Sequence, residues 1–352
     1  MYTSLRLQHF RNYTDQAFEL SPQVNVVVGL NGSGKTNLLE AILVLSQGVS
    51  YRAPDRELLE HNKTWSRLDG VLKDGSERIW KLDYRHDRPQ KSFIIGGSAL
   101  KRLTLHRALP VALFEPEHMR LLTGQPEIRR EFIDTILEQT VPGFRTTRLN
   151  YRRALSQRNR LLKQGVSDLD HLFVWNVRLS ELGALIATQR ALLVDRMNAT
   201  IGTVYSSIAD NVTKLEVIYH STTSLHDYAS HLLKDLEKHT ARDIERGFTS
   251  VGPHRDDLRF LIGGHDSEFS ASRGETRTII LSCKLIELQV LEEAYDKRPI
   301  VLLDDVFSEL DSTRRAALAQ YLQDYQTIIT TTDADTVKSK SLKTGQRITL
   351  SA

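Results

Sequence analysis

The residues with the clearest chemistry form one loop that fits the phosphate-binding pattern G-x-x-x-x-G-K-[ST] at every fixed position. They are Gly29, Leu30, Asn31, Gly32, Ser33, Gly34, Lys35 and Thr36. In such a loop, consecutive backbone N–H groups bind phosphate oxygens, and the helix that follows adds its positive N-terminus. We expect Lys35 to reach the β- and γ-phosphates of ATP, and the Thr36 hydroxyl to ligate Mg²⁺. The alternative is a chance match in a glycine-rich turn.

A second candidate for chemistry lies near the other end of the chain. Ile300–Leu303 is a run of four apolar residues followed by Asp304 and Asp305. Open α/β sheets bind ligands at the carboxyl ends of their strands, which is where this run would deliver its two acids. Asp304 is predicted to hold Mg²⁺, and Asp305 to orient the attacking water. The alternative is a strand followed by an acidic helix cap.

Three further segments would position these residues. Val24–Val28 is rich in β-branched residues and predicts a buried strand before the loop, and residues 37–43 predict the helix after it. Thr327–Thr330 predicts a last core strand. Lys35 and Asp304 are 269 positions apart (304 minus 35), whereas compact P-loop kinases and GTPases carry the two motifs much closer together. This spacing indicates the ATP-binding-cassette class with a large insertion.

That class carries a signature motif before its acidic strand, and residues 271–275 (Ala-Ser-Arg-Gly-Glu) resemble it. Ser272 and Gly274 keep their places in the motif, while alanine and arginine replace a leucine and a glycine. In the class, the signature contacts the γ-phosphate held by a second protomer, so two ATP molecules are sandwiched in a head-to-tail dimer. The resemblance therefore predicts an ATP-dependent homodimer. The alternative is a serine that only caps a helix.

Composition limits the other possibilities. The chain has 352 residues, which suggests two domains or one large domain with an insertion. A formal net charge of +3 means that any nucleic-acid affinity must come from a local patch. The single cysteine, Cys283, excludes an intramolecular disulfide and is compatible with a cytoplasmic protein. No run of apolar residues is long enough to cross a membrane, and no histidines and cysteines have metal-ligand spacing.

The coarse pattern predicts an α/β protein. We expect short strands over residues 3–28, antiparallel hairpins over 65–105, helices from Val111 to about Glu245, and a hairpin in which 258–262 and 268–269 flank two glycines. A long helix should run from about 275 to 297. The predicted architecture is an ABC-type ATPase head, that is, a P-loop sheet lobe with an antiparallel β subdomain, and an inserted, mainly helical lobe. The ATP-binding lobe takes residues 1–112 and 290–352, and the lobe with the signature takes 113–289.

Four motifs together resemble the RecF family, bacterial recombination-mediator ATPases related to SMC heads, over nearly the whole chain. They are residues 10–13 (Phe-Arg-Asn-Tyr), 116–134 around Leu-Leu-Thr-Gly, 252–258 (Gly-Pro-His-Arg-Asp-Asp-Leu) and 303–311 around Asp-Asp-Val-Phe. Gln125 departs from the family pattern, where a small or acidic residue is usual.

The resemblance implies an ATP-dependent DNA-binding protein that loads a recombinase at gaps with RecO and RecR, and a weak ATPase that serves as a dimerisation switch. It also adds Arg11 and Asn12 to the predicted nucleotide-binding residues. Slow hydrolysis agrees with the sequence, because residues 329–333 (Ile-Thr-Thr-Thr-Asp) stand where transporter ATPases have a histidine, and a threonine cannot become a cation. The alternatives are a transporter subunit, a cassette ATPase with nuclease activity, or a protein that binds ATP without hydrolysing it.

The one clear basic run lies in residues 145–163, which contain seven lysines and arginines and no acid. Arg145, Arg148, Arg152 and Arg153 are the predicted DNA contacts, made to the backbone independently of base sequence. The equally weighted alternative is a solvated face whose arginines pair with acids elsewhere in the fold. For His254, Arg255, Asp256 and Asp257 we expect a structural charge network.

Overall fold

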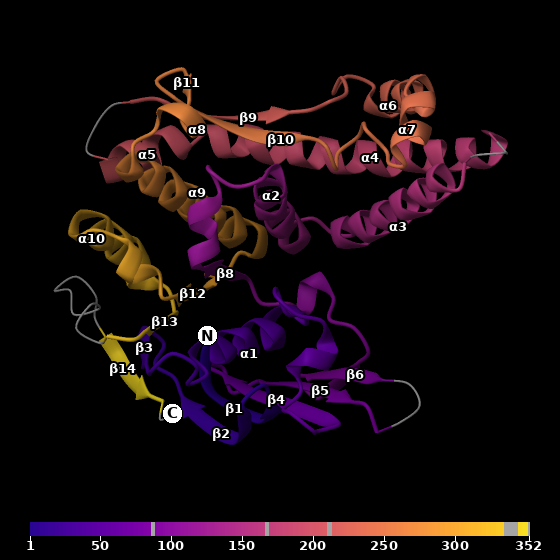
Figure 1. Cartoon of the computed structure of the whole chain (residues 1–352). Helices are drawn as coiled ribbons and strands as arrows, with labels where there is room; N and C mark the ends of the chain where they lie inside the picture. Colours follow the sequence, from indigo (N-terminus) through magenta and orange to yellow (C-terminus); the bar gives the residue numbers. More distant parts are fainter. Residues whose placement is uncertain (86–88, 166–168, 210–212, 334–343, 351–352) are drawn as a thin grey trace. The chain divides into compact units, whose positions relative to one another are not determined.

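The computed structural model describes residues 1–85, 89–165, 169–209, 213–333 and 344–350. The chain divides into two compact units, one made of Met1–His118 and Glu287–Ala352 and the other of Met119–Ile286 (Figure 1). The lobes expected from the sequence, residues 1–112 with 290–352 and residues 113–289, remain a prediction.

The first unit contains a parallel sheet built from both ends of the sequence. Every strand pair in it is parallel, and its core strands are apolar and buried. The strands, in sheet order, are β14 (Thr344–Thr349), β3 (Val24–Val28), β13 (Thr327–Thr331), β12 (Ile300–Asp304) and β8 (Val111–Phe114). The predicted α/β class is therefore confirmed, and β3, β12 and β13 lie side by side.

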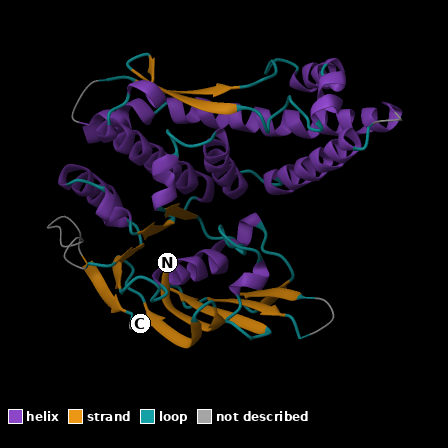
Figure 2. Cartoon of the chain, in the orientation of Figure 1, coloured by secondary structure: helices purple, strands orange, loops and turns teal. Residues whose placement is uncertain are grey.

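An antiparallel sheet completes the first unit (Figure 2). Helix α1 (Lys35–Gln47) has ten buried residues, and its apolar side chains belong to one core cluster with side chains of both sheets. Burial on all sides explains why residues 38–45 are almost continuously apolar rather than amphipathic. The antiparallel strands, in sheet order, are β2 (Tyr13–Glu19), β1 (Tyr2–Phe10), β4 (Trp65–Leu72), β5 (Glu77–Asp83), β6 (Gln90–Ile95) and β7 (Ser98–Leu100).

Shorter helices join these strands. The 3-10 turns are η1 (Asp55–Leu58), η2 (Leu105–Arg107), η3 (Pro116–Arg120), η4 (Val306–Glu309) and η5 (Leu322–Asp324), and α10 (Ser312–Tyr321) lies between η4 and η5. No helix in the described part of the chain is both long and apolar enough to span a membrane.

The second unit is mainly helical. Its longest helix, α4, packs against α3, α6 and strand β9 (Figure 1). The helices are α2 (Pro126–Thr140), α3 (Phe144–Lys163), α4 (Leu169–Asn198), α5 (Ile201–Ala209), α6 (Tyr228–Lys238), α7 (Thr240–Arg246) and α8 (Ser267–Ser270). A small antiparallel sheet has the order β11 (His265–Asp266), β10 (Asp257–Ile262) and β9 (Leu215–His220). Helix α9 (Arg273–Tyr295) begins in this unit and ends among residues of the first.

Two expectations about local structure were wrong. The stretch 111–245 is not helical throughout, because β8 and β9 lie within it. Both are runs of four to six residues, for which apolar periodicity does not separate a strand from a buried helical turn. Glu268 and Phe269 are not in the second strand of a hairpin, because the Asp266 side chain accepts a hydrogen bond from the Glu268 amide and starts the short helix α8.

Candidate nucleotide site

The glycine-rich loop connects β3 to α1, as the sequence predicted. Gly32 and Gly34 have φ angles of 83° and 99°, a region that favours glycine. Gly34 also needs the space, because a Cβ atom built there would lie 2.7 Å from the Asn12 amide nitrogen. The Tyr13 hydroxyl donates a hydrogen bond to the Gly34 carbonyl oxygen over 3.0 Å. Residues at the turn between β1 and β2 therefore pack against the phosphate loop and hydrogen-bond to its backbone.

The loop places two side-chain hydrogen-bond donors close together, and one of them has no acceptor among the described residues. The buried Lys35 ammonium donates to the carbonyl oxygens of Gly29 at 2.7 Å and Leu30 at 2.9 Å. The Ser33 hydroxyl is buried and has no hydrogen-bond partner among the described residues. Leu30, in contrast, is 69% exposed. A lysine and a free hydroxyl beside backbone N–H groups form a donor set that fits phosphate oxygens.

The acidic strand meets this loop across 268 positions of sequence. Asp304 Oδ1 accepts hydrogen bonds from Thr36 Oγ1 at 3.1 Å and from Thr330 Oγ1 at 2.6 Å. The Asp304 carboxylate and the Thr36 hydroxyl offer oxygen ligands of the kind that Mg²⁺ prefers. Thr330 was not among the predicted site residues, although its position in place of a transporter histidine was visible in the sequence.

Asp305 lies next to this junction in a left-handed conformation, with φ of 52°. Its backbone N–H donates to the carbonyl and hydroxyl oxygens of Thr330 at 3.2 and 3.1 Å, which fixes the turn. Burial raises the pKa of the Asp305 carboxyl, opposed by the charge of Lys35, and nearby Asp304 raises it further. A carboxylate whose proton affinity is raised is better suited to take a proton from water.

Arg11 and Asn12 differ in what they offer. The Arg11 guanidinium makes two 2.8 Å hydrogen bonds to the buried Glu40 carboxylate of α1, which Arg52 and Ser50 also bind. Burial opposes ionisation of Glu40, but these hydrogen bonds outweigh it and hold its pKa at about 2. Arg11 is thus tied to α1 in this structure. The Asn12 side-chain oxygen Oδ1 accepts a hydrogen bond from the Asn37 side-chain amide. Both residues line a surface depression of about 580 Å³, together with Arg11, Arg52 and His61.

Ser272 and Gly274 belong to the second unit. The Ser272 backbone N–H and hydroxyl donate to the Glu275 carboxylate at 2.9 and 2.7 Å, and the Glu275 N–H donates back to the hydroxyl at 3.3 Å. This reciprocal pattern is a capping box at the start of α9. It accounts for the serine as a helix cap, and the exposed hydroxyl remains a predicted γ-phosphate ligand. In the described ranges, no cluster of three or more His, Cys, Asp or Glu could hold a metal ion.

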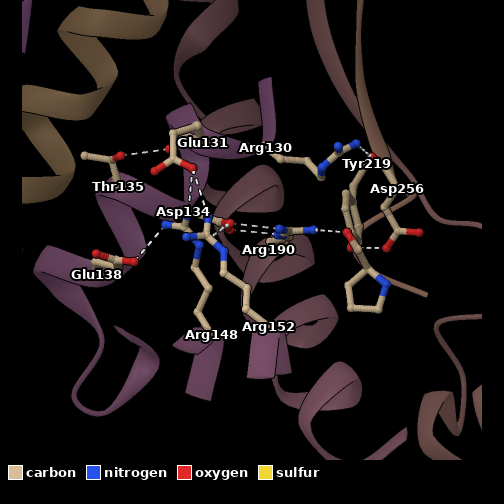
Figure 3. Close-up of polar contacts among 11 residues, drawn as sticks. Arg130, Glu131, Asp134, Thr135, Glu138, Arg148, Arg152, Arg190, Tyr219 and Asp256 are labelled. Carbon is tan, nitrogen blue, oxygen red and sulfur yellow. Dashed lines mark hydrogen bonds and ion pairs between the residues drawn. The ribbon is translucent and has the colours of Figure 1, made fainter. Parts of the chain in front are cut away.

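The basic run forms most of α3, and its arginines fall into two groups. Arg148 is buried among carboxylates of α2: it bonds to Glu131 and lies 2.7 Å from Glu138 and 3.1 Å from Asp134 (Figure 3). Its assignment as a DNA contact was wrong in physical terms, because its charge is already matched in the interior. Arg145, Arg152 and Arg153 are exposed. They remain predicted DNA contacts, although Arg145 and Arg152 have loose ion pairs of 3.8 and 3.4 Å with α2.

The expected charge network around residues 254–257 is present. Asp256 is fully buried and accepts hydrogen bonds from the Tyr219 hydroxyl at 2.5 Å and the Thr222 N–H at 2.8 Å. Asp257 binds the Arg129 guanidinium through both oxygens. The His254 ring contacts the Tyr151 hydroxyl at 2.7 Å and the Thr249 carbonyl oxygen at 3.1 Å. These contacts hold the second unit together and involve no nucleotide-loop residue.

A parallel sheet with a phosphate loop, an acidic strand beside it and an antiparallel sheet on the same core defines an ABC-type nucleotide-binding head. The model of the RecF/RecN/SMC N-terminal domain matches residues 1–349. The chain belongs to the RecF family.

Two relatives illustrate the match. The DNA replication and repair protein RecF of Lachnoclostridium phytofermentans is 34% identical over 347 residues, covering 97% of this chain and 95% of that protein. RecF of Streptococcus uberis is 36% identical over 341 residues, covering 94% and 93%.

Solved structures agree with this assignment. A structure described as the recombination mediator protein RecF with ATPrS in the RecFOR pathway has a TM-score of 0.87 and 29% identity, and covers 100% of this chain and 96% of that one. RecF with ATP gives 0.81 and 32%, with coverage of 94% and 92%. An Smc head with 14% identity and a TM-score of 0.53, which covers 96% of this chain and 90% of its own, shares the fold.

Proposed function

We propose that this chain is an ATP-dependent DNA-binding protein of replication, recombination and repair, acting in the cytoplasm with RecO- and RecR-type mediator proteins to load a recombinase at gaps. The observation that carries the proposal is the contact of Thr36 with Asp304, since it joins the two halves of a nucleotide site. The RecF relatives, described as DNA replication and repair proteins and as members of the RecFOR pathway, support the biological setting.

The phosphate loop would hold the nucleotide. Residues 29–34 offer backbone N–H groups and the unspent Ser33 hydroxyl, and the Lys35 ammonium would exchange its two carbonyl partners for phosphate oxygens. Thr36 and Asp304 are the proposed holders of Mg²⁺, which neutralises phosphate charge when bound. Asn12 lines the depression that would take the remainder of the nucleotide. Arg11 would act through Glu40, by fixing the turn against α1.

Hydrolysis is proposed to be weak and to serve as a timer. Asp305 would orient the attacking water, and its raised proton affinity suits this role. Thr330 can hold Asp304 and the Asp305 backbone, but a threonine hydroxyl cannot become a cation that stabilises charge on the γ-phosphate. A slow enzyme would keep ATP long enough for its binding, rather than its cleavage, to set the assembly state.

ATP would control assembly through a head-to-tail homodimer. Ser272 and Gly274 would contact the γ-phosphate bound by a second copy, so ATP would favour the dimer because it binds that state more tightly. Arg145, Arg152 and Arg153 would bind the DNA backbone on exposed positions of α3. Sequence-independent contacts of this kind depend strongly on salt.

The test is the molar mass in solution of Asp305→Asn, a variant designed to bind ATP without turning it over. We expect a monomer without nucleotide and a dimer with ATP and Mg²⁺. The matched control combines Asp305→Asn with Ser272→Arg, which should bind ATP and remain monomeric. A monomer in all conditions, with bound ATP demonstrated by fluorescence of a labelled nucleotide, would contradict the sandwich. Binding of ATP by a Lys35→Ala variant at the affinity of the unmodified chain would contradict the site itself.

A further inference from the structure

A hollow of about 310 Å³ on the second unit is not used by any function described so far. It lies between α7 and the loop that follows this helix, and α7 packs beside α3 (Figure 1). Gly247 ends α7 with φ of 71° and so turns the chain back along the hollow. The residues that matter in its lining are His239, Arg242, Arg246, Phe248, Ser250 and Arg255.

Three guanidinium groups surround this hollow, and none has a carboxylate partner among the residues that the structure describes. Arg242 and Arg246 are exposed on α7, and neither forms an ion pair with any residue that the structure describes. The Arg255 guanidinium lies 4.9 Å from the centre of the Phe248 ring and donates to the Thr249 carbonyl oxygen. The two acids of α7 do not neutralise these arginines. Asp243 forms a buried ion pair with Arg158, and Glu245 forms no ion pair with any of the three arginines. The hollow is therefore strongly positive.

A buried hydroxyl adds an unused donor. Ser250 Oγ lacks solvent contact and has no hydrogen-bond partner within the described ranges, although Ser250 lines the hollow. The backbone N–H of the same residue is fixed by the Asp243 carboxylate at 3.1 Å, so the side chain starts from a fixed place. Buried polar groups are nearly always paired, and an unpaired one beside free guanidinium groups indicates a ligand with several acceptor oxygens.

We propose that this hollow binds a phosphate group of a DNA strand, at a site distinct from the phosphate loop. A phosphate supplies acceptors for Arg242 and Arg246, and for the Ser250 hydroxyl once a change of rotamer turns it from the interior toward the hollow. Arg255 covers one face of Phe248, so the ring positions Arg255 rather than stacking on a base. The inference rests on the proposed DNA binding, and it names where one phosphate is held.

The surroundings favour a polymer over a single anion. Lys163 of α3 packs on the end of α7, since a Cβ atom built on Gly247 would lie 3.2 Å from its Cγ. The Asn159 side chain accepts from the Thr249 N–H and hydroxyl at 2.8 and 2.7 Å, which joins the two elements. A second hollow of about 520 Å³ follows α3, lined by Arg152, Arg160 and Lys163. Cations thus continue from one hollow to the next, as a phosphate backbone requires.

The test compares Arg246→Gln with Arg259→Gln, because both remove one exposed arginine of the same unit, and Arg259 lies on β10 outside the hollow. Binding of a fluorescent DNA duplex is measured from 50 to 200 mM salt. Arg246→Gln should lower the slope of log K against log salt by about 0.9, the value for one lost phosphate contact, and Arg259→Gln should not. Ser250→Ala, which removes only the unpaired hydroxyl, should weaken DNA binding several-fold while ATP binding is kept.

The outcomes are separable. If the unmodified chain does not bind DNA, the proposed function fails. If it binds DNA and Arg246→Gln behaves like Arg259→Gln, DNA binding stands and this phosphate site is refuted. Titration with inorganic phosphate identifies the source of the anion: loss of phosphate binding in Arg246→Gln with an unchanged DNA slope would assign the hollow to a free anion and overturn the proposal. Amide hydrogen exchange in peptides of the second unit, unchanged in each variant, shows that the fold around the hollow is preserved.

Discussion

Acidification should destabilise the second unit through His254. Burial, helped by the positive charges of Arg255 and Arg130, lowers the pKa of this imidazole to about 4, although the Thr249 carbonyl oxygen opposes the shift. The neutral ring suits its contacts, because Nε2–H can donate to Thr249 while Nδ1 accepts from the Tyr151 hydroxyl. Protonation would place a further charge among arginines.

The size of the effect follows from the two pKa values. The pKa of a histidine in an unfolded chain is about 6.5. Between roughly pH 4 and 6.5 the His254 ring is therefore protonated in the unfolded chain and neutral in the folded one. Stability from this group is complete above that window and is lost as the pH falls. The loss is about 1.4 kcal/mol at pH 5.5 and about 3 kcal/mol once pH 4 is passed, at 1.36 kcal/mol for each pKa unit.

Urea unfolding at pH 7.5 and 5.5 tests this, with His254→Gln as the matched variant that cannot titrate. Unfolding is measured by amide hydrogen exchange in peptides of the second unit, because the two units of the chain need not unfold together. The original chain should lose about 1.4 kcal/mol more than the variant on acidification. Equal losses, or a His254 ring that titrates near 6.5 by NMR, would refute the reasoning.

Three further predictions concern the nucleotide site. Gly34→Ala should abolish binding of a fluorescent ATP analogue because of its φ angle and its contact with Asn12, and Gly32→Ala, with open space around it, should bind more tightly than Gly34→Ala; the reverse order would contradict the packing argument. Thr330→Val should lower unfolding stability by about 2 kcal/mol and slow ATP turnover in a phosphate-release assay, while Thr330→Ser stays close to the original; a harmless valine would exclude the role of this hydroxyl. Glu40→Gln should cost about 3 kcal/mol in urea unfolding at neutral pH, because two arginines lose a shared buried carboxylate, and a change below about 1 kcal/mol would show that water replaces it.

The sequence was sufficient where function depends on local chain geometry. The phosphate loop and the acidic strand each need fixed residues at fixed spacing, so residues 29–36 and 300–305 could be recognised without their neighbours. Their meeting through Thr36 and Asp304 followed from strand ends in an open sheet and is present in the structure.

What the sequence did not resolve depends on contacts between distant segments. In the basic run, Arg148 and Arg152 look alike, and only the carboxylates of α2 decide that Arg148 is buried and Arg152 exposed. The contact between Thr330 and Asp304 could not be predicted, because it depends on the register in which β13 pairs with β12. The hollow at Arg246 could not be predicted, because its lining combines a helix end with a loop whose path is fixed by α3.

The place of β3 in its sheet has a consequence for how the protein is made. Both hydrogen-bonded neighbours of this strand, β13 and β14, come from residues after 326. During synthesis at about 5–20 residues per second, the phosphate loop therefore waits roughly 15 to 60 s for the strands that flank it. An apolar strand with two open edges is a target for chaperones and a risk for aggregation during that interval. A chain that ends before β13 would carry the complete phosphate motif on a strand without its sheet neighbours. Binding of ATP by a nascent chain would therefore indicate that β13 and β14 had been synthesised.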